Sequence, residues 1–410
     1  MAEYVPPPTA GLPLHLSDLW PWGDDDLAGA LAYWLRVPAV QLECSGTAAL
    51  MVALAALKQL APARTEVVIP AYTCPLVALA VAQSGLRPRL CDLRPDRLDM
   101  DPGQMAALCS ERTLALLPTH LCGRVADVGA ALACARAVGA YVIEDAAQAL
   151  GARMHGEPVG WQGDIGFYSL AVGKGLSTYE GGVLLARDPA LREALRAAGR
   201  AARHASRYWE WRRSLELLGY ALLYRPRGLG RAYGRPLRAA LARGDWVQAA
   251  GDDFGDHIPR HPLGAWRRRV GVRALHRLGR FQARLADQAH ERLAQLAAIP
   301  GLEVLGDIVP GTRGVWPVLL LRLPSAAARD ALLRAHWGAG LGLSLPFVHA
   351  LPDYGRYDHV LAGARGEEVP RARDWAARLV AVSNSLWLDE ERFVRLLRIL
   401  EQAALDRRAA

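Results

Sequence analysis

The chain has 410 residues, 52% of them hydrophobic, which is enough for a sizeable core divided between two or three structural domains. Charged residues make up 22%, a share that excludes a compositionally disordered chain. The longest apolar stretch, 46–57, is too short to span a bilayer, and residues 1–10 lack the basic and apolar regions of a signal peptide. We therefore expect a cytoplasmic protein.

Short β-rich runs alternate with helical runs from about residue 48 to 198. Strands are predicted at 66–70, 89–93, 113–118, 140–144, 165–170 and 182–186. Helices are predicted at 48–60, 74–83, 102–109, 126–138 and 188–198. This alternation is typical of an α/β layer built on a mostly parallel sheet.

The six cysteines all lie in the first third of the chain: Cys44, Cys74, Cys91, Cys109, Cys122 and Cys134. None forms a CxxC pair and no cluster of histidines accompanies them, so no metal site is expected. We interpret them as reduced, mostly buried thiols of a cytosolic protein.

The segment 203–243 differs from the rest in charge. It holds ten arginines and two acids, so it carries the whole formal net charge of +8, and tyrosine and tryptophan interleave with the arginines. One interpretation is peripheral association with an anionic membrane. The favoured one is a solvated or dimer-facing helical insertion. Nucleic acid is not an expected partner, because the excess charge is confined to this segment.

A second α/β pattern follows a long predicted helix at 266–296. Strands are predicted at 312–323 and 341–345, and helices at 326–337, 370–382 and 389–405. We therefore predict a large domain over 15–298, which includes an arginine- and aromatic-rich insertion at about 203–260 and the connecting helix. A smaller α/β C-terminal domain is predicted over 299–410.

Lysine is rare in this chain, and its rarity is informative. Lys58 and Lys174 are the only lysines among 49 basic residues. Arginine cannot lose its proton in a protein, whereas lysine can do so and attack a carbonyl carbon. Lys58 stands near the polar end of a predicted helix and fits a surface charge. Lys174 stands between Gly173 and Gly175 in a predicted loop, which favours a chemical role.

Two groups of residues at predicted strand ends could bind a ligand together with Lys174. Ser45, Gly46 and Thr47 open a helix, where free amides and hydroxyl groups suit a phosphate, although this motif taken alone is better explained by an ordinary helix cap. Asp145 ends an apolar strand, where a carboxylate needs a partner such as a protonated ring nitrogen.

Further polar residues complete the set. Gln148 could reach the same ligand as Asp145, and Ser169, five residues before Lys174, could anchor a phosphate. Gly181 and Gly182 permit close backbone approach. Each element is weak alone, but the order of phosphate loop, acid and lysine indicates pyridoxal 5'-phosphate.

With these motifs in place, the chain resembles the DegT/StrS family of pyridoxal-dependent sugar aminotransferases. The matching stretches are 45–50, 68–73, 118–123, 142–149, 163–166 and the lysine segment. The resemblance implies an aspartate-aminotransferase-like α/β fold (fold type I) and a homodimer. It also implies transfer of an amino group from an amino acid, with glutamate as the expected donor, to a keto-sugar nucleotide or related carbonyl compound.

The resemblance also assigns roles. Lys174 becomes the Schiff-base lysine and proton shuttle, Asp145 the partner of the pyridine nitrogen, and Gln148 a contact of the ring. Phosphate binding falls to the loop and the serine before the lysine: Ser45, Gly46, Thr47 and Ser169. The expected substrate contacts are His120, Glu180 and His349.

Several positions depart from the family pattern. Cys74 stands where the family has an aromatic residue stacked on the cofactor ring, so Tyr72 is the alternative stacking residue. The histidine expected before the lysine is replaced by Ala171, and no asparagine occurs near Leu263. These departures leave a lipid-linked or other non-sugar substrate open.

Two further hypotheses compete with aminotransfer. An elimination reaction, such as a dehydratase, is disfavoured because Lys174 is present and the cysteine spacing does not suggest an iron–sulfur cluster. A non-catalytic regulator is disfavoured because Lys174, Asp145 and Ser169 are all retained.

Overall fold

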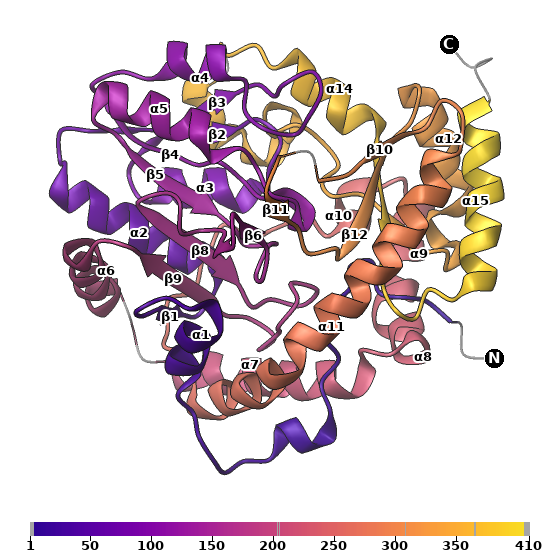
Figure 1. Cartoon of the computed structure of the whole chain (residues 1–410), viewed down its shortest axis with the longest axis horizontal. Coiled ribbons are helices and arrows are strands. Elements are labelled where there is room, and N and C mark those ends of the chain that lie inside the picture. The colour runs from indigo at the N-terminus through magenta and orange to yellow at the C-terminus, as the bar shows by residue number, and fades with distance from the viewer. Residues whose placement is uncertain (1–3, 203, 205, 308, 365, 406–410) are drawn as a thin grey trace.

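The computed structural model describes residues 4–202, 204, 206–307, 309–364 and 366–405. A seven-stranded sheet forms its larger part (Figure 1). Its order is β1 (Gln41–Glu43), β9 (Gly182–Ala186), β8 (Ile165–Ser169), β5 (Tyr141–Asp145), β4 (Thr113–Leu116), β2 (Glu66–Pro70), β3 (Arg87–Cys91). The five strands from β8 to β3 are parallel, β9 runs antiparallel to β8, and β1 pairs antiparallel with β9 and so runs in the same direction as the five. The predicted mixed, mostly parallel sheet is therefore confirmed.

Helices cover both faces of this sheet, so its central strands are buried. They are α1 (Leu27–Leu35), α2 (Gly46–Leu60), α3 (Pro75–Gln83), α4 (Pro102–Leu108), α5 (Val128–Val138) and α6 (Pro189–Ala202). Ten of the fifteen residues of α2 are buried, because this helix packs against β8, β9, α3 and α6 at once. Its beginning is thereby fixed beside the ends of β8 and β9.

A smaller antiparallel sheet has the order β10 (Glu303–Leu305), β12 (Val318–Arg322), β14 (Leu379–Ser383), β13 (Leu343–Ser344). It packs with α12 (Ala326–His336), α14 (Pro370–Arg378) and α15 (Glu390–Leu405). The predicted helix at 370–382 is wrong in its second half. Residues 379–383, with two valines, form the buried strand β14, which pairs with both β12 and β13.

The predicted strand at 312–323 is also divided in the structure. β11 (Thr312–Arg313) pairs with β6 (Arg153–Met154), which in turn pairs with β7 (Glu157–Pro158) in a third, small sheet. β12 begins only at Val318, after Pro317, whose missing amide cannot join a ladder. The small third sheet therefore ties residues 312–313 to the edge of the larger part.

The long helix α11 (Ala265–Ala297) confirms the predicted helix at 266–296 and runs from the large sheet's region to the small sheet (Figure 1). Val270, Ala274 and Leu278 pack in the core shared with the large sheet, and Ala289 and Leu296 pack in the core under the small sheet. The apolar stripe of one helix thus joins both cores. The predicted domain boundary at 298 and 299 stays a prediction.

The predicted insertion is helical. It contains α7 (Arg207–Leu223), α8 (Pro226–Leu229), a π-helical turn η3 (Gly230–Gly234), α9 (Arg235–Ala242) and α10 (Trp246–Ala250). Leu237 and Ala249 pack against Trp337, Leu345 and Val348 of the C-terminal part. Leu217 and Tyr220 of α7 pack in the core of the large sheet, so the insertion contacts both parts and is not only a surface appendage.

The remaining short elements are turns that connect these parts. They are η1 (Leu16–Leu19), η2 (Leu121–Gly123), η4 (Trp337–Ala339), η5 (Leu351–Asp353), η6 (Gly355–Tyr357), α13 (Asp358–Leu361) and η7 (Ala362–Ala364). The six cysteines form no disulfide, and three are buried. Among the described residues, no helix has the length and apolar character that crossing a bilayer requires.

An N-terminal arm, residues 4–12, threads between the parts and was not predicted from the sequence. The amide of Val5 donates to the carbonyl of Pro226 at 3.1 Å, and that of Ala10 to Pro317 at 2.9 Å. The amide of Leu12 donates to the carbonyl of Gly175 at 2.8 Å, directly after Lys174. The arm therefore contacts the insertion, the C-terminal part and the lysine loop.

Candidate active site

One cavity of about 230 Å³ collects most of the residues singled out from the sequence. It lies where β5 and β8 end and α2 begins, as expected for a ligand site in an open α/β sheet. The predicted site residues that line it are Ser45, Gly46, Thr47, Cys74, His120, Asp145, Gln148, Ser169, Lys174 and Glu180. Folding therefore brings the three sequence motifs to a single place.

The beginning of α2 forms the anion-binding end. The hydroxyl of Ser45 caps the helix by accepting from the amide of Ala48 at 3.0 Å, so the simple capping interpretation is correct for this side chain. No hydrogen bond among the described residues uses the amides of Gly46 and Thr47. A Cβ on Gly46 would lie 3.0 Å from the Cβ of Ser169, so glycine lets the helix start approach that serine closely.

Asp145 ends β5 and is 5% exposed. One of its carboxyl oxygens, Oδ1, accepts from the amide of Ala147 at 3.0 Å. Burial raises the pKa of Asp145, while the Ala147 amide and the positive charge of Lys174 oppose that rise. A buried carboxylate of this kind is stabilised by a cationic ligand group in the same cavity.

The lysine loop depends on two glycines. Gly173 and Gly175 have φ values of +77° and +80°, which a side chain would disfavour. The amide of Lys174 donates to the carbonyl of Ala171 at 3.2 Å, and the amide of Ala171 donates to the hydroxyl of Ser169 at 3.3 Å. Among the described residues no carboxylate pairs with Lys174, which lines this cavity and the one next to it.

Three residues were predicted to contact the cofactor ring: Gln148, Cys74 and Tyr72. Gln148 is held by the amide of Cys122, which donates to its Oε1 at 2.6 Å. Cys74 lines the cavity, but Tyr72 is not among the described lining residues. Instead, the Tyr72 hydroxyl donates to the carbonyl of Phe347 at 3.0 Å, behind that wall. A stacking role for Cys74 or Tyr72 stays a prediction.

Two aromatic wall residues were missed by the sequence analysis. Phe254 comes from the part of the insertion that follows α10, and Phe347 comes from the C-terminal part. The chain contains only five phenylalanines, and three of them, Phe167, Phe254 and Phe347, line this cavity. The same rarity that singled out Lys174 was therefore an available signal.

His120 lines the cavity, but both of its ring nitrogens are occupied by the protein. Nε2 lies 3.0 Å from Oε2 of Glu144, and Nδ1 accepts from the amide of Ala126 at 3.0 Å. Glu144 also accepts from the amides of Gly160, Gln162 and Gly163. The ring thus orders the turn around Asp145, and its predicted substrate role stays a prediction.

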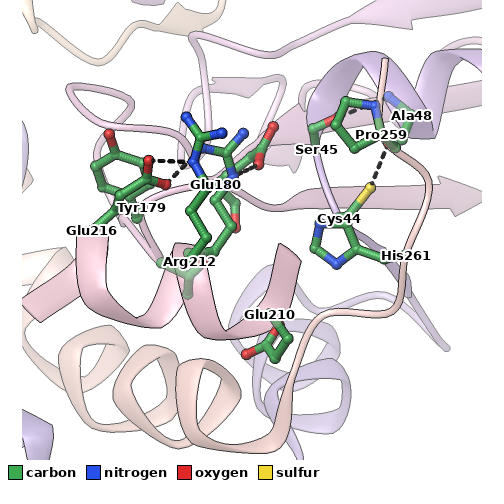
Figure 2. Close-up of polar contacts among 12 residues, drawn as sticks. Cys44, Ser45, Ala48, Tyr179, Glu180, Glu210, Arg212, Glu216, Pro259 and His261 are labelled. Atoms are coloured by element: carbon green, nitrogen blue, oxygen red, sulfur yellow. Dashed lines mark hydrogen bonds and ion pairs between the residues drawn. The ribbon is translucent and has the colours of Figure 1, made fainter. Parts of the chain in front are cut away.

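Glu180 faces the cavity and forms an ion pair with Arg213 of α7. Figure 2 shows Glu180 above the helix that carries Arg212 and Glu216, with Ser45 and Cys44 to its right. Burial raises the pKa of Glu180, and the positive charge of Arg213 opposes that rise. The sequence analysis missed Arg213, because its partner lies 33 positions earlier in the chain.

Arg267 makes a second connection between α7 and the catalytic loop. Its buried guanidinium pairs with Glu210 of α7 at 2.7 Å and donates to the carbonyl of Glu180 at 2.8 Å. The backbone and the carboxylate of Glu180 are therefore each held by an arginine. Tyr179, whose φ is +66°, is fixed in a left-handed conformation beside them.

His349 is not among the described residues that line this cavity. Its ring packs edge-on against Tyr354 at 5.2 Å, and the Tyr354 hydroxyl donates to Oδ2 of Asp252 at 2.6 Å. Asp252 lines the neighbouring cavity of about 300 Å³, which shares Lys174 with the first. The structure therefore places His349 two side chains away from the site, and its substrate role stays a prediction.

The geometry describes the ligand that the first cavity can hold. It offers free helix amides for an anion, a buried carboxylate for a cationic ring nitrogen, and an amine for an aldehyde. Among the described residues, no group of histidine, cysteine and acidic side chains has the arrangement of a metal site. These features fit pyridoxal 5'-phosphate.

Known proteins provide an independent comparison. The model of the DegT/DnrJ/EryC1/StrS aminotransferase family matches residues 24–222. A pleiotropic regulatory protein of Geobacillus stearothermophilus is 39% identical over 132 residues, which are 32% of this chain and 36% of that relative. The chain therefore spans only about a third of that relative's length.

Two longer matches exist at lower identity. The dTDP-3-amino-3,4,6-trideoxy-alpha-D-glucose transaminase of Streptomyces venezuelae is 28% identical over 339 residues, covering 81% of this chain and 74% of that protein. The crystal structure of the sugar aminotransferase CalS13 from Micromonospora echinospora has a TM-score of 0.73 at 23% identity, covering 96% and 99% of the two chains. This likeness confirms the predicted aspartate-aminotransferase-like fold. Through residues 24–222, just under half of its length, the chain is similar to the DegT/DnrJ/EryC1/StrS aminotransferase family.

Proposed function

We propose that this protein is a pyridoxal 5'-phosphate-dependent aminotransferase. The observation that carries the proposal is the placement of Lys174 in one cavity with the free amides of α2 and the buried carboxylate of Asp145. When bound there, the cofactor supplies an electron sink for the carbon that bears the amino group. The family match supports the same activity.

The protein's own residues divide the work. The amine of Lys174 holds the aldehyde and then moves a proton at the carbon that gains or loses the amino group. Asp145 keeps the proton on the ring nitrogen, and the amides of Gly46 and Thr47 with the hydroxyl of Ser169 hold the phosphate. The apolar side chains of Phe254 and Phe347 exclude water from the reacting atoms.

The proposed acceptor is a keto-sugar, nucleotide-linked or free, or a related carbonyl compound, and the proposed donor is glutamate. Support for the acceptor comes from the Streptomyces venezuelae relative, whose name describes transamination of a dTDP-linked sugar. The side chain of Glu180, which faces the cavity, is available for a hydroxyl group of the acceptor.

An absorbance spectrum tests the central claim. Purified protein mixed with pyridoxal 5'-phosphate should develop a near-visible band, and borohydride reduction followed by peptide mapping should place the label on Lys174. A donor and acceptor screen should then give amino product without release of ammonia. Ammonia release would support elimination instead, and a protein that binds no cofactor would overturn the proposal in favour of a regulator.

We also propose that the protein forms a homodimer and that α7 contributes to an intermolecular surface. Exposed apolar side chains recur along α7 at helical spacing: Tyr208, Trp211, Leu215, Leu218 and Leu222. The alternative predicted partner of this face is an anionic membrane, to which the exposed arginines of 207–243 would be attracted. Sedimentation separates monomer from dimer, and flotation with anionic vesicles at low salt tests the membrane.

A further inference from the structure

A second cavity of about 300 Å³ opens on the other side of Lys174. Five residues line both cavities: Cys74, Gln148, Lys174, Phe254 and Phe347. The second cavity lacks the anion-binding loop, Asp145 and Ser169. The second cavity therefore begins at the reactive amine and extends away from the end that fits the cofactor phosphate. A second reactant has to lie on this side of the amine.

Its walls come from parts of the chain that are far apart. The N-terminal arm contributes Pro8 and Thr9, the insertion contributes Tyr233, and the C-terminal part contributes Trp337 and Leu345. Most of this lining is apolar, as in small-molecule sites where a few polar groups fix the ligand's orientation. The insertion at 203–260 thus helps to build the substrate end of the site.

Charge in this cavity is unusual for a site that would bind a phosphate ester. Among the described residues that line either cavity, Lys174 is the only lysine or arginine. Its amine is committed to the cofactor aldehyde in the proposed function. The second cavity instead contains a carboxylate, Asp252, so a diphosphate there would meet a like charge and no guanidinium.

Asp252 is 3% exposed and firmly positioned. Its Oδ2 accepts from the hydroxyl of Tyr354 at 2.6 Å and from the amide of Val348 at 2.9 Å. No donor among the described residues reaches Oδ1. Burial raises the pKa of Asp252, and these two hydrogen bonds oppose that rise. Oδ1 is therefore open to the cavity that Lys174 also lines, where a hydroxyl group of a ligand can donate to it.

We propose that the second cavity is the acceptor site and that Asp252 selects an uncharged, polyhydroxylated ketone by accepting a hydrogen bond from one of its hydroxyl groups. The acceptor would be a free keto-sugar or a cyclic polyhydroxylated ketone, in preference to a nucleotide-linked one. Tyr354 and Val348 position the carboxyl group. This inference rests on the proposed aminotransferase function and names its substrate class.

Two acceptors and the holoenzyme test the proposal. The probes are an uncharged polyhydroxylated cyclohexanone and a UDP-linked 3-keto sugar, each with glutamate as donor. The wild-type enzyme should favour the uncharged ketone by roughly a hundredfold in kcat/KM, because the linked diphosphate meets a carboxylate without a compensating cation. A preference for the UDP-linked sugar would overturn the proposal.

Asp252→Asn separates recognition from folding. An asparagine oxygen can still accept from Tyr354 and Val348, but the group facing the ligand changes from an acceptor to a donor. KM for the uncharged ketone should rise roughly tenfold to a hundredfold with kcat little changed. Calorimetric binding of the ketone to the cofactor-loaded enzyme without donor should weaken by the same factor.

The neighbouring residue provides a matched control. Asp253 is exposed and pairs with Arg356, so Asp253→Asn should leave both KM values unchanged. If Asp252→Asn folds poorly, Tyr354→Phe serves in its place, because it keeps the carboxyl group of Asp252 and removes one hydrogen bond to it. KM for the uncharged ketone should then rise less, by a few-fold. Equal KM values in wild type and folded Asp252→Asn contradict the proposal.

The donor half of the reaction shows whether a negative result concerns the role of Asp252 or the aminotransferase function itself. Glutamate should change the spectrum of the bound cofactor at the same rate in wild type and Asp252→Asn, since no acceptor is present. A wild-type enzyme that shows no such change refutes the aminotransferase function itself. Normal donor chemistry combined with the wrong acceptor preference refutes only the role of Asp252.

Discussion

The two ends of the active site are built in different ways. The cofactor end is formed by residues 45–47, 145–148 and 169–174, which follow strands or open a helix within one α/β layer. The proposed substrate end is formed by the N-terminal arm, the insertion and the C-terminal part, up to 373 positions apart from Pro8 to Ala381. One end is therefore encoded locally, and the other only by the complete fold.

This difference concerns how tightly each end is constrained. The cofactor end rests on strand ends, a helix start and glycine conformations, which tolerate little change. The substrate end rests on packing between segments, which can change without disturbing the sheet. We infer that one end of the cavity sets the chemistry and that the other end selects the acceptor.

Lys174→Arg should have the largest effect. Arginine keeps the positive charge but cannot attack an aldehyde or return a proton, so activity should fall by about a thousandfold or more. Product formation with saturating donor and acceptor measures the loss. Lys58→Arg is the matched control: Lys58 donates to the carbonyls of Ser84 and Gly85, which arginine can also do, and activity should stay normal.

Asp145→Asn should lower activity about a hundredfold, as expected when a charge that stabilises the reacting state is removed. It should also change stability in the opposite direction. Because the pKa of Asp145 is raised in the fold, the cofactor-free protein loses stability as the pH rises through the ordinary aspartate range near 4.

The unfolding temperature measures that second effect. Cofactor-free Asp145→Asn should unfold at a higher temperature than the wild type at pH 8, and the difference should vanish near pH 3, where the native aspartate is protonated in both states. Addition of pyridoxal 5'-phosphate should reverse the order. A variant that is less stable than the wild type at pH 8 without cofactor would show that burial is not the dominant influence on Asp145.

Arg213→Gln probes the junction between the two ends. The largely buried Glu180 would lose its ionic partner, and Glu216 would lose one of its two, which should lower the free energy of unfolding by about 2 kcal/mol at pH 7. The loss should shrink as the pH falls and Glu180 takes a proton. Urea denaturation measures it. In Arg212→Gln, which breaks only the more exposed pair with Glu216, the loss should stay below about 0.5 kcal/mol.

Trp211→Glu and Leu222→Glu should have the smallest effect on the fold. Both side chains are exposed, 63% and 57%, so the free energy of unfolding should change by less than about 0.5 kcal/mol. The same variants should shift the protein toward the monomer in sedimentation if α7 lies in a dimer interface. An unchanged sedimentation profile together with lost vesicle flotation would assign the face to a membrane.

Much of the large sheet and of the cofactor end was predictable from sequence. The strands 66–70 and 182–186 agree residue for residue, because Glu66 and Pro70 bound the first apolar run and Gly182 and Arg187 bound the second. Lys174 and Asp145 were recognised from local context: a lysine between glycines and an acid at the end of an apolar strand. An element can be predicted from sequence where the residues that determine it lie within one short segment.

The strand β14 and the residues at the proposed substrate end were not predictable from sequence, because contacts between distant segments determine them. Leu379 to Ser383 continue a helical pattern, and only pairing with β12 and β13 makes them a strand. Asp252 and Phe347 belong to the site because the insertion and the C-terminal part pack together through Trp337 and Ala249. No short-range pattern carries such contacts.

The N-terminal arm has a consequence for the order in which the chain matures on the ribosome. The hydroxyl of Tyr4 donates to the carbonyl of Trp387, and Ala10 is bonded to Pro317. Both partners are synthesised more than 300 codons after the arm residues that they bind, and Pro317 follows Gly175, where the arm braces the lysine loop, by 142 codons. We therefore expect the lysine loop, although translated early, to reach its final position only after Pro317 and Trp387 have been synthesised, and we expect cofactor binding to follow that step.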